Sequence, residues 1–184
     1  DVARFCMDFY AARMEIGGDD IICAGMDKAK ESQIVEAGDM KVPYVVFVLG
    51  ESTDRNHMSL YGYNLPTSPL LEAREKQGEL AVFDDTIACG NGTTQAMSMI
   101  FNTAPKDRDS SDPWYEYLNL IDTIRMAGYH TTWLSNQEPS SGWGNLEGVY
   151  AHRSDEFKFM RITGGIKGGG FVAAQPDEQL LPYL

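Results

Sequence analysis

A chain of 184 residues, of which 43% are hydrophobic and 23% charged, has the composition of one globular domain, so a disordered chain is not expected. The 27 Asp and Glu residues outnumber the 15 Lys and Arg residues and give a net charge of −12, which argues against binding to nucleic acid or to anionic lipid. The longest apolar run, at residues 44–49, is too short to cross a bilayer, so this chain by itself is expected to be soluble.

The first predicted elements are a helix, a linker and a strand. Residues 2–15 place apolar side chains along one side of a helix, which the glycine pair 17–18 is expected to end. Residues 19–41 are mixed and polar, and they indicate a linker with room for one short helix. The apolar run at residues 44–49 is entered through Pro43 and is typical of a strand covered on both faces in a parallel sheet.

Helices then alternate with strands along the chain. Helices are predicted at residues 66–77, 93–101 and 115–126, and strands at residues 80–87, 130–134 and 156–160. Ser68 is the expected N-cap of the first of these helices, and residues 137–150 are expected to form a long loop because they are rich in Gly, Ser and Pro. The glycines at 168–170 indicate a flexible break. This alternation predicts an α/β fold, an α/β/α sandwich with a mainly parallel sheet.

Two polar residues follow predicted strands, where the functional groups of open parallel sheets gather. Glu51 comes directly after the strand at residues 44–49, although an acidic side chain in such a turn is most often simply solvated. Thr93 follows the Gly-Asn-Gly turn at residues 90–92 and begins a predicted helix, whose N-terminus suits a phosphate. The alternative interpretation is that Thr93 or Thr94 is an ordinary N-cap.

The chemistry of Glu51 and Thr93 makes most sense if they act together. A threonine hydroxyl is a poor nucleophile at neutral pH and needs a base or a metal ion. A zinc ion stabilises an alkoxide and accepts carboxylate oxygen as a ligand. Glu51 and Thr93 both lie at the ends of strand-to-helix connections, so the two side chains are expected to meet on one ion.

Other residues carry weaker signals. His57, His130 and His152 show no paired metal-binding spacing, so a structural or surface role is favoured for each. Asn136 follows the strand at residues 130–134 and therefore lies on the expected active face, although asparagine there is often only a turn residue.

Two aromatic residues and the cysteines leave alternatives open. Trp133 and Trp143 could support an apolar substrate but are more often anchors of a core or loop. Three cysteines, at positions 6, 23 and 89, are too few for a zinc knuckle or a disulfide scaffold, and one pair plus one free thiol stays open.

Three segments in a fixed order carry a resemblance to a known family. VVFVLGESTDRNHMSLYGYNLPTSPLL resembles the opening of the catalytic domain of phosphoethanolamine transferases, which belong to the sulfatase and alkaline-phosphatase superfamily. VFDDTIACGNGTTQAMSMIF is similar to their nucleophile segment, and MAGYHTTWLSNQE resembles the segment that follows it. The match is strong over residues 41–137 and weaker up to the final DEQLLPYL.

The resemblance implies a reaction and a set of roles. Such enzymes move phosphoethanolamine from phosphatidylethanolamine to lipopolysaccharide, at lipid A or core sugars, through a covalent phospho-threonine beside a zinc ion. By motif, Thr93 takes the nucleophile role, with Thr94 as competitor, and Glu51 and Thr93 are metal ligands. Asn136 matches an asparagine near the substrate phosphate.

The resemblance also implies an organisation. Residues 1–40 are expected to be a connector helix and linker, and residues 41–184 the N-terminal part of the catalytic domain, at the periplasmic face of a Gram-negative inner membrane. The remaining Asp and His zinc ligands are expected beyond Leu184, so this chain alone is expected to be an incomplete, inactive fold that self-associates. Met99 stands where many members have a cysteine that pairs with the one matching Cys89, so that disulfide is not expected.

Alternative functions remain open at this point. A sulfatase is disfavoured because CGNGTTQ has neither the proline nor the arginine of the Cys-x-Pro-x-Arg and Ser-x-Pro-x-Arg motifs. Another phosphohydrolase of the superfamily, a glycerol-phosphate transferase and a non-catalytic domain that has lost the metal are the alternatives.

Overall fold

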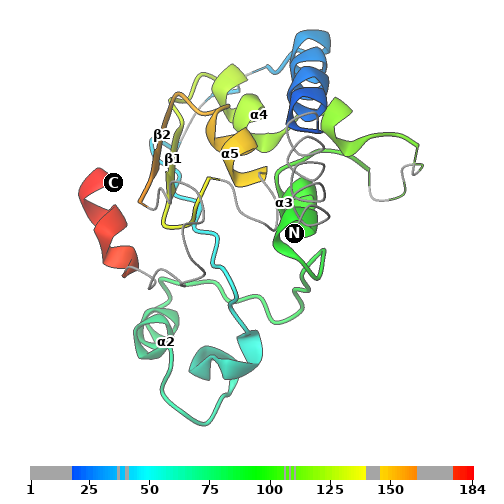
Figure 1. The fold of residues 1–184 in the computed structure, drawn as a ribbon. Helices are drawn as coiled ribbons and strands as arrows, with labels where there is room; N and C mark the ends of the chain where they lie inside the picture. Colours follow the sequence, from blue (N-terminus) through cyan, green and yellow to red (C-terminus); the bar gives the residue numbers. More distant parts are fainter. Residues whose placement is uncertain are drawn as a thin grey trace, which may run out of the picture. The chain divides into compact units, whose positions relative to one another are not determined.

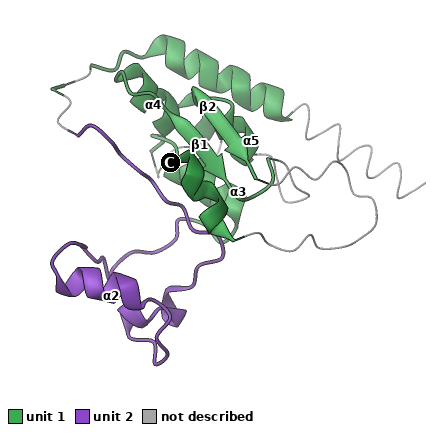
Figure 2. Cartoon of the chain, turned by 90° about the vertical axis from the view of Figure 1, so that its left-hand side faces the viewer, with its two compact units in different colours: residues 1–41, 90–184 green, residues 42–89 purple. Residues whose placement is uncertain are grey.

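A computed structural model describes residues 18–36, 38–39, 42–105, 107, 109, 111–139, 146–160 and 176–184. The chain divides into two compact units, each of which is described by itself (Figure 2). Unit 1 combines the described parts of residues 1–41 and 90–184, and unit 2 is residues 42–89. The helix predicted at residues 2–15, the glycine break at 168–170 and Trp143 lie outside the described residues. The predicted domain boundary between residues 40 and 41 stays a prediction.

The sheet of unit 1 is a parallel pair, β1 (Thr132–Ser135) and β2 (Glu156–Phe159), drawn side by side in Figure 1. Trp133 pairs with Phe157 in the register of the two strands. Both strands were predicted from the sequence and are confirmed, with bounds that differ by one or two residues. Helices between and around parallel strands make the fold α/β, as predicted.

Helix α5 (Leu146–Ala151) connects the two strands, where the sequence favoured a continuous loop over residues 137–150. That prediction is wrong for the second part of the segment. Leu146, Val149 and Tyr150 are buried in the core, so packing stabilises a short helix in a stretch whose composition favours turns.

Three further helical segments surround the sheet. They are α3 (Thr93–Ile100), the 3₁₀ segment η3 (Trp114–Glu116) and α4 (Leu120–Met126). The first confirms the helix predicted at residues 93–101, one residue shorter at its end. The single helix predicted at residues 115–126 is wrong as one element, because residues 117–119 interrupt it. A new helix, α4, begins after Asn119, whose side chain caps it by accepting a hydrogen bond from the backbone N–H of Asp122.

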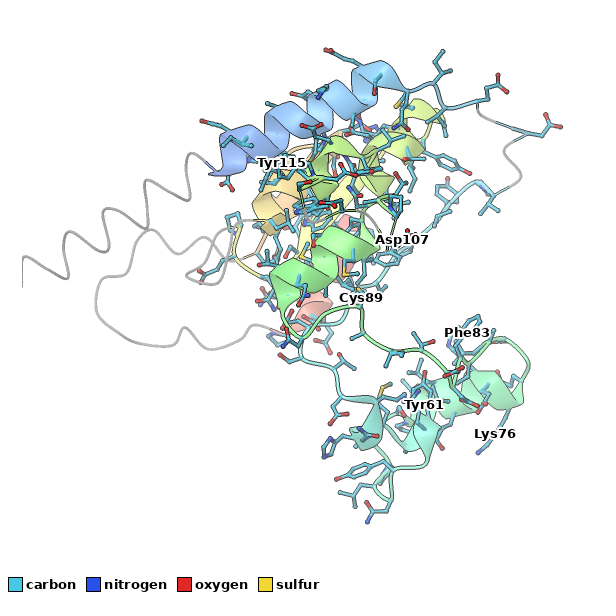
Figure 3. All side chains as sticks on the ribbon, turned by 90° about the vertical axis from the view of Figure 1, so that its right-hand side faces the viewer. Tyr61, Lys76, Phe83, Cys89, Asp107 and Tyr115 are labelled. Carbon is cyan, nitrogen blue, oxygen red and sulfur yellow. The ribbon has the colours of Figure 1, made fainter. Side chains whose placement is uncertain are left out.

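A helix at residues 18–32 packs onto this core, where the sequence predicted a linker with one short helix. Gly18 is the first described residue of this helix. The predicted end of the preceding helix at the glycine pair 17–18 falls outside the described residues and stays a prediction. Met26 and Ala29 are buried in the core, and this packing stabilises the helix despite its polar composition. Tyr115 lies against the helix (Figure 3), where a Cβ added at Gly25 would come within 2.5 Å of the Tyr115 ring.

A buried polar network joins the same helix to α4 and to the turn after α5. Asp122 and Asn119 are fully buried, and Arg153 donates to the Asp122 carboxylate and to Asp27 of the helix at 3.0 Å. Lys30 Nζ lies 3.8 Å from the second Asp122 oxygen. Burial alone would lower the pKa of Arg153, but its bonds to the two carboxylates raise it above the usual value.

Unit 2 contains two 3₁₀ segments, η1 (Arg55–His57) and η2 (Ser59–Tyr61), and helix α2 (Pro69–Lys76). Helix α2 confirms the helix predicted at residues 66–77 with Ser68 as its N-cap. The Ser68 hydroxyl is almost buried, and it accepts a hydrogen bond from the backbone N–H of Leu60 at 2.9 Å. Hydroxyl groups therefore tie the loop after Glu51 to the start of α2.

The strands predicted at residues 44–49 and 80–87 are wrong as secondary structure. Both segments lie outside any strand of the described residues, and Tyr44, Val48 and Ile87 are 86%, 84% and 89% exposed. A strand needs a neighbouring strand for its backbone hydrogen bonds, and these apolar runs find no such pairing in the described part of unit 2.

The C-terminal 3₁₀ segment η4 (Asp177–Tyr183) contacts β1 in unit 1 and is drawn beside the sheet in Figure 1. None of the helices that the structure describes is both long and apolar enough to span a membrane.

Candidate active site

Thr93 is the first residue of α3, and both Thr93 and Thr94 are exposed. The helix is fixed at its other end, because Met97 and Phe101 are buried in the core of unit 1. A side chain at the start of an anchored helix has a defined position, and the backbone N–H groups there favour an anionic ligand. Thr93 therefore lies at a helix start of the kind that binds anions, and its role as nucleophile stays a prediction.

The N-cap of α3 is Gly92, so the alternative interpretation of Thr93 or Thr94 as the N-cap is wrong. Glycine caps a helix nearly as well as threonine does, so neither threonine is needed as the cap. Gly90 lies close over the helix: an added Cβ would come within 2.8 Å of the Gln95 side chain and 3.0 Å of the Ala96 nitrogen. The two glycines thus let the chain turn tightly into the helix that carries Thr93.

Glu51 is exposed in a tight turn of unit 2. Ser52, with φ of 51°, is the one non-glycine residue with positive φ among those the structure describes, and its hydroxyl donates to Glu51 Oε1 at 3.1 Å. The turn is followed by the Asp54 cap of η1. Glu51 and Thr93 belong to different units, so the prediction that the two side chains meet stays a prediction.

An aspartate and a histidine form a pair in the loop after Glu51. Asp54 caps η1 by accepting from the backbone N–H of Asn56 at 2.9 Å, and its other oxygen lies 2.8 Å from His57 Nδ1. The Asn56 N–H, followed by His57, holds the pKa of Asp54 below its usual value. The Thr67 hydroxyl donates to the His57 carbonyl at 2.7 Å. His57 is thereby part of the loop's own structure.

Asn136 lies directly after β1, at the carboxyl end of the strand. Its side-chain Nδ2 donates to Asp177 Oδ1 at 2.7 Å, across 41 residues of sequence. The preceding Ser135 hydroxyl lies 3.5 Å from Glu147 Oε2 of α5. Polar groups from β1, α5 and η4 thus gather at this end of the strand, as expected for an open parallel sheet.

The other two histidines make contacts outside this edge. His130 lies 3.8 Å from Asp155 and 3.6 Å from Glu156, and the His152 ring packs edge-on against Phe157. Among the described residues, no group of three or more His, Cys, Asp and Glu side chains is placed to hold a metal ion. Trp133 packs with Phe101 and Tyr150, which makes it part of the core.

Comparison with known proteins decides the family. The family model described as Sulfatase matches residues 43–184, a range that includes Glu51, Thr93 and Asn136. The chain belongs to the sulfatase family. This membership confirms the resemblance seen in the sequence and the alkaline-phosphatase-like α/β fold that it implies.

Relatives of this sulfatase-family chain are named as transferases. Phosphoethanolamine transferase EptC of Escherichia coli (strain K12) is 30% identical over 117 residues, which is 63% of this chain and 20% of the relative. Phosphoethanolamine transferase EptA of Helicobacter pylori is 34% identical over 141 residues, 76% of this chain and 22% of the relative. Phosphatidylethanolamine transferase Mcr-1 of Escherichia coli is 30% identical over 115 residues, 62% of this chain and 21% of the relative. The chain therefore spans about a fifth of the length of these curated relatives, and no solved structure matches it.

Sequence reasoning missed Asp177 as a neighbour of Asn136. The two residues lie 41 positions apart in the sequence, so no local spacing reveals their hydrogen bond. It also missed the network of Asn119, Asp122 and Arg153, although Asn three residues before Asp at a helix start is a recognisable capping pattern.

Proposed function

We propose that this chain provides part of the catalytic domain of a phosphoethanolamine transferase in which Thr93 is the nucleophile. The observation that carries the proposal is the exposed position of Thr93 as the first residue of an anchored helix, after a glycine turn, in a sulfatase-family chain. The relatives' names support the group that is transferred.

The proposed reaction has two displacements at phosphorus. Thr93 Oγ1 attacks the phosphorus of phosphatidylethanolamine, the bond to diacylglycerol breaks, and the departing oxygen takes the proton that the threonine loses. An acceptor hydroxyl, for which we propose lipopolysaccharide at lipid A or a core sugar, then displaces Thr93 and restores its hydroxyl. We place this reaction at the periplasmic face of a Gram-negative inner membrane, where that acceptor occurs.

We propose zinc as the metal, held by Glu51 and Thr93 together with Asp and His ligands beyond Leu184. Both residues offer oxygen donors that zinc accepts, and both are exposed, so the donor types fit. When bound, zinc supplies the charge that makes a threonine hydroxyl nucleophilic at neutral pH. Metal analysis of the purified protein and of its Glu51→Gln variant tests this assignment, with loss of zinc expected in the variant.

Asn136 is proposed to contact the phosphoryl group from the end of β1. An amide N–H is a suitable donor to a non-bridging phosphoryl oxygen, and it carries no charge that would compete with the metal. We expect Asn136→Ala to lower the rate of transfer while leaving zinc content unchanged.

The function is tested by measuring transfer from labelled phosphatidylethanolamine to lipopolysaccharide with the full-length gene product. Thr93→Ala is expected to lower the rate by about 10³-fold or more, because no covalent intermediate forms. The free energy of unfolding of this variant should stay within about 0.5 kcal/mol of the wild-type value, because Thr93 is exposed and is not the N-cap of α3. Thr94→Ala is the matched control and should remain active. An inactive Thr94→Ala beside an active Thr93→Ala would move the nucleophile by one residue.

The alternatives are distinguished by the same assay. Release of phosphoethanolamine to water without an acceptor would indicate a phosphohydrolase, and transfer from phosphatidylglycerol would indicate a glycerol-phosphate transferase. Absence of both zinc and turnover in the full-length gene product would indicate a non-catalytic domain. The sulfatase motif is absent from CGNGTTQ, so sulfate-ester hydrolysis is not expected.

We further propose that residues 1–184 alone self-associate and do not turn over. The apolar segment at residues 44–49 is largely exposed, and two proposed ligands are fewer than a stable zinc site uses.

A further inference from the structure

The C-terminal segment η4 is fixed to the sheet at both of its ends. At its start, Asp177 Oδ1 accepts from Asn136 Nδ2 at 2.7 Å. At its end, the Tyr183 ring lies under the ammonium of Lys158 in β2, with Nζ 3.4 Å from the ring centroid. One short segment therefore contacts a residue after β1 and a residue of β2 (Figure 1).

The bond between Asp177 and Asn136 determines how the amide of Asn136 is oriented. An ionised carboxylate only accepts hydrogen bonds, so the nitrogen end of the amide, and not its oxygen, must face Asp177. A bond to a charged acceptor is about twice as strong as one between neutral groups. The amide therefore cannot flip without losing this bond and placing its oxygen against a carboxylate.

We propose that Asp177 is a positioning residue that holds the Asn136 amide in the orientation needed to donate to the phosphoryl group. This inference rests on the proposed function of Asn136. A phosphate and a carboxylate both require N–H donors, and the single Nδ2 atom carries two of them. Fixing one N–H on Asp177 fixes the direction of the other, which is the preorganisation that phosphoryl transfer needs.

The test compares Asp177→Ala and Asp177→Asn with Glu178→Ala in the full-length gene product. Glu178 is the exposed neighbour in the same turn, so its variant removes the same charge without touching Asn136. We expect Asp177→Ala to lower kcat about 10-fold to 100-fold with little change in KM. Asp177→Asn keeps an acceptor oxygen and should recover much of that loss, and Glu178→Ala should behave as the wild type.

A second readout separates positioning from a general loss of structure. The side-chain amide NMR signals of Asn136 in the full-length gene product should shift in Asp177→Ala and should keep their wild-type positions in Glu178→Ala. Wild-type kcat in Asp177→Ala beside an impaired Asn136→Ala would overturn the inference and leave the proposed function standing. Wild-type kcat in Asn136→Ala would overturn both the inference and the proposed role of Asn136. Activity retained in Thr93→Ala would instead contradict the proposed function itself.

Discussion

Asp155 accepts hydrogen bonds from two separate segments of unit 1. It accepts from the backbone N–H of Thr131 at 2.8 Å, from the Thr131 hydroxyl at 3.0 Å, and from Arg125 at 2.7 Å. The Thr131 backbone N–H, followed by the Thr131 hydroxyl and Arg125, lowers the pKa of Asp155 from 3.8 to about 2. Asp155 thus ties the start of β1 to the start of β2 and to α4 in its ionised form.

Because the folded pKa of Asp155 lies below the unfolded one, its contribution to stability is present above pH 3.8 and lost as the pH falls toward about 2. Asp155→Asn should be less stable than the wild type at pH 7 and should lose less stability between those two pH values. Urea unfolding across this range measures both effects, with Asp20→Asn as an exposed control. If the free energies of unfolding of the wild type and of Asp155→Asn fell equally as the pH is lowered, the stabilising role of ionised Asp155 would be contradicted.

Arg153 is expected to be essential to the buried network because, among the residues that the structure describes, it is the cation nearest to Asp122. Arg153→Met leaves a fully buried carboxylate with Lys30 at 3.8 Å, and the loss of one partner of a buried pair costs about 3–5 kcal/mol. Arg74→Met, at an exposed position in α2, should change stability by less than about 0.5 kcal/mol. Chemical denaturation compares the two, and equal small effects would show that the network contributes little.

Some contacts of the candidate site can be predicted from the sequence and others cannot. The position of Thr93 at a helix start follows from the adjacent glycines, so local pattern was sufficient. The contact of Asn136 with Asp177 and that of Asp122 with Arg153 span 41 and 31 residues, and no local spacing encodes them. Whether Glu51 and Thr93 meet is a contact of this same long-range kind, and it stays a prediction.

At the scale of elements, strands were predicted correctly only where a partner strand lies close. The segments at residues 130–134 and 156–160 pair with each other as β1 and β2. The segments at residues 44–49 and 80–87 have stronger apolar character but no strand pairing among the described residues. Composition indicates that a segment can be a strand, whereas pairing decides whether it is one. Helix α5 is the opposite case: the composition of its segment favours turns, but the burial of its apolar side chains stabilises a helix.

The packing of the helix at residues 18–32 is tested by a glycine pair. Gly25→Ala places a methyl group 2.5 Å from the Tyr115 ring, so we expect a destabilisation of about 1–3 kcal/mol. Gly18→Ala has no heavy atom within 4 Å and should be neutral or stabilising by up to about 1 kcal/mol. Thermal unfolding of residues 1–184 measures both. Equal effects of the two substitutions would mean that the helix does not pack on Tyr115.

At the scale of the whole molecule, the exposed apolar segment at residues 44–49 predicts association between copies of the chain. Apolar, uncharged segments of this length with high strand propensity pair readily with identical segments. Val46→Lys combined with Val48→Lys should shift sedimentation of residues 1–184 toward the monomer, because charges on the segment oppose such pairing. Ile34→Lys replaces a single exposed apolar residue and should leave the distribution unchanged. A wild-type chain that stays monomeric at all concentrations would contradict this proposal.

Trapping the covalent intermediate shows whether Thr93 carries the transferred group. The full-length gene product is exposed to phosphatidylethanolamine without acceptor, quenched in denaturant, digested and analysed by mass spectrometry. We expect one phosphoethanolamine group on Thr93, present in Thr94→Ala and absent in Thr93→Ala. A modification on Thr94, or steady turnover with no modified threonine, would contradict it.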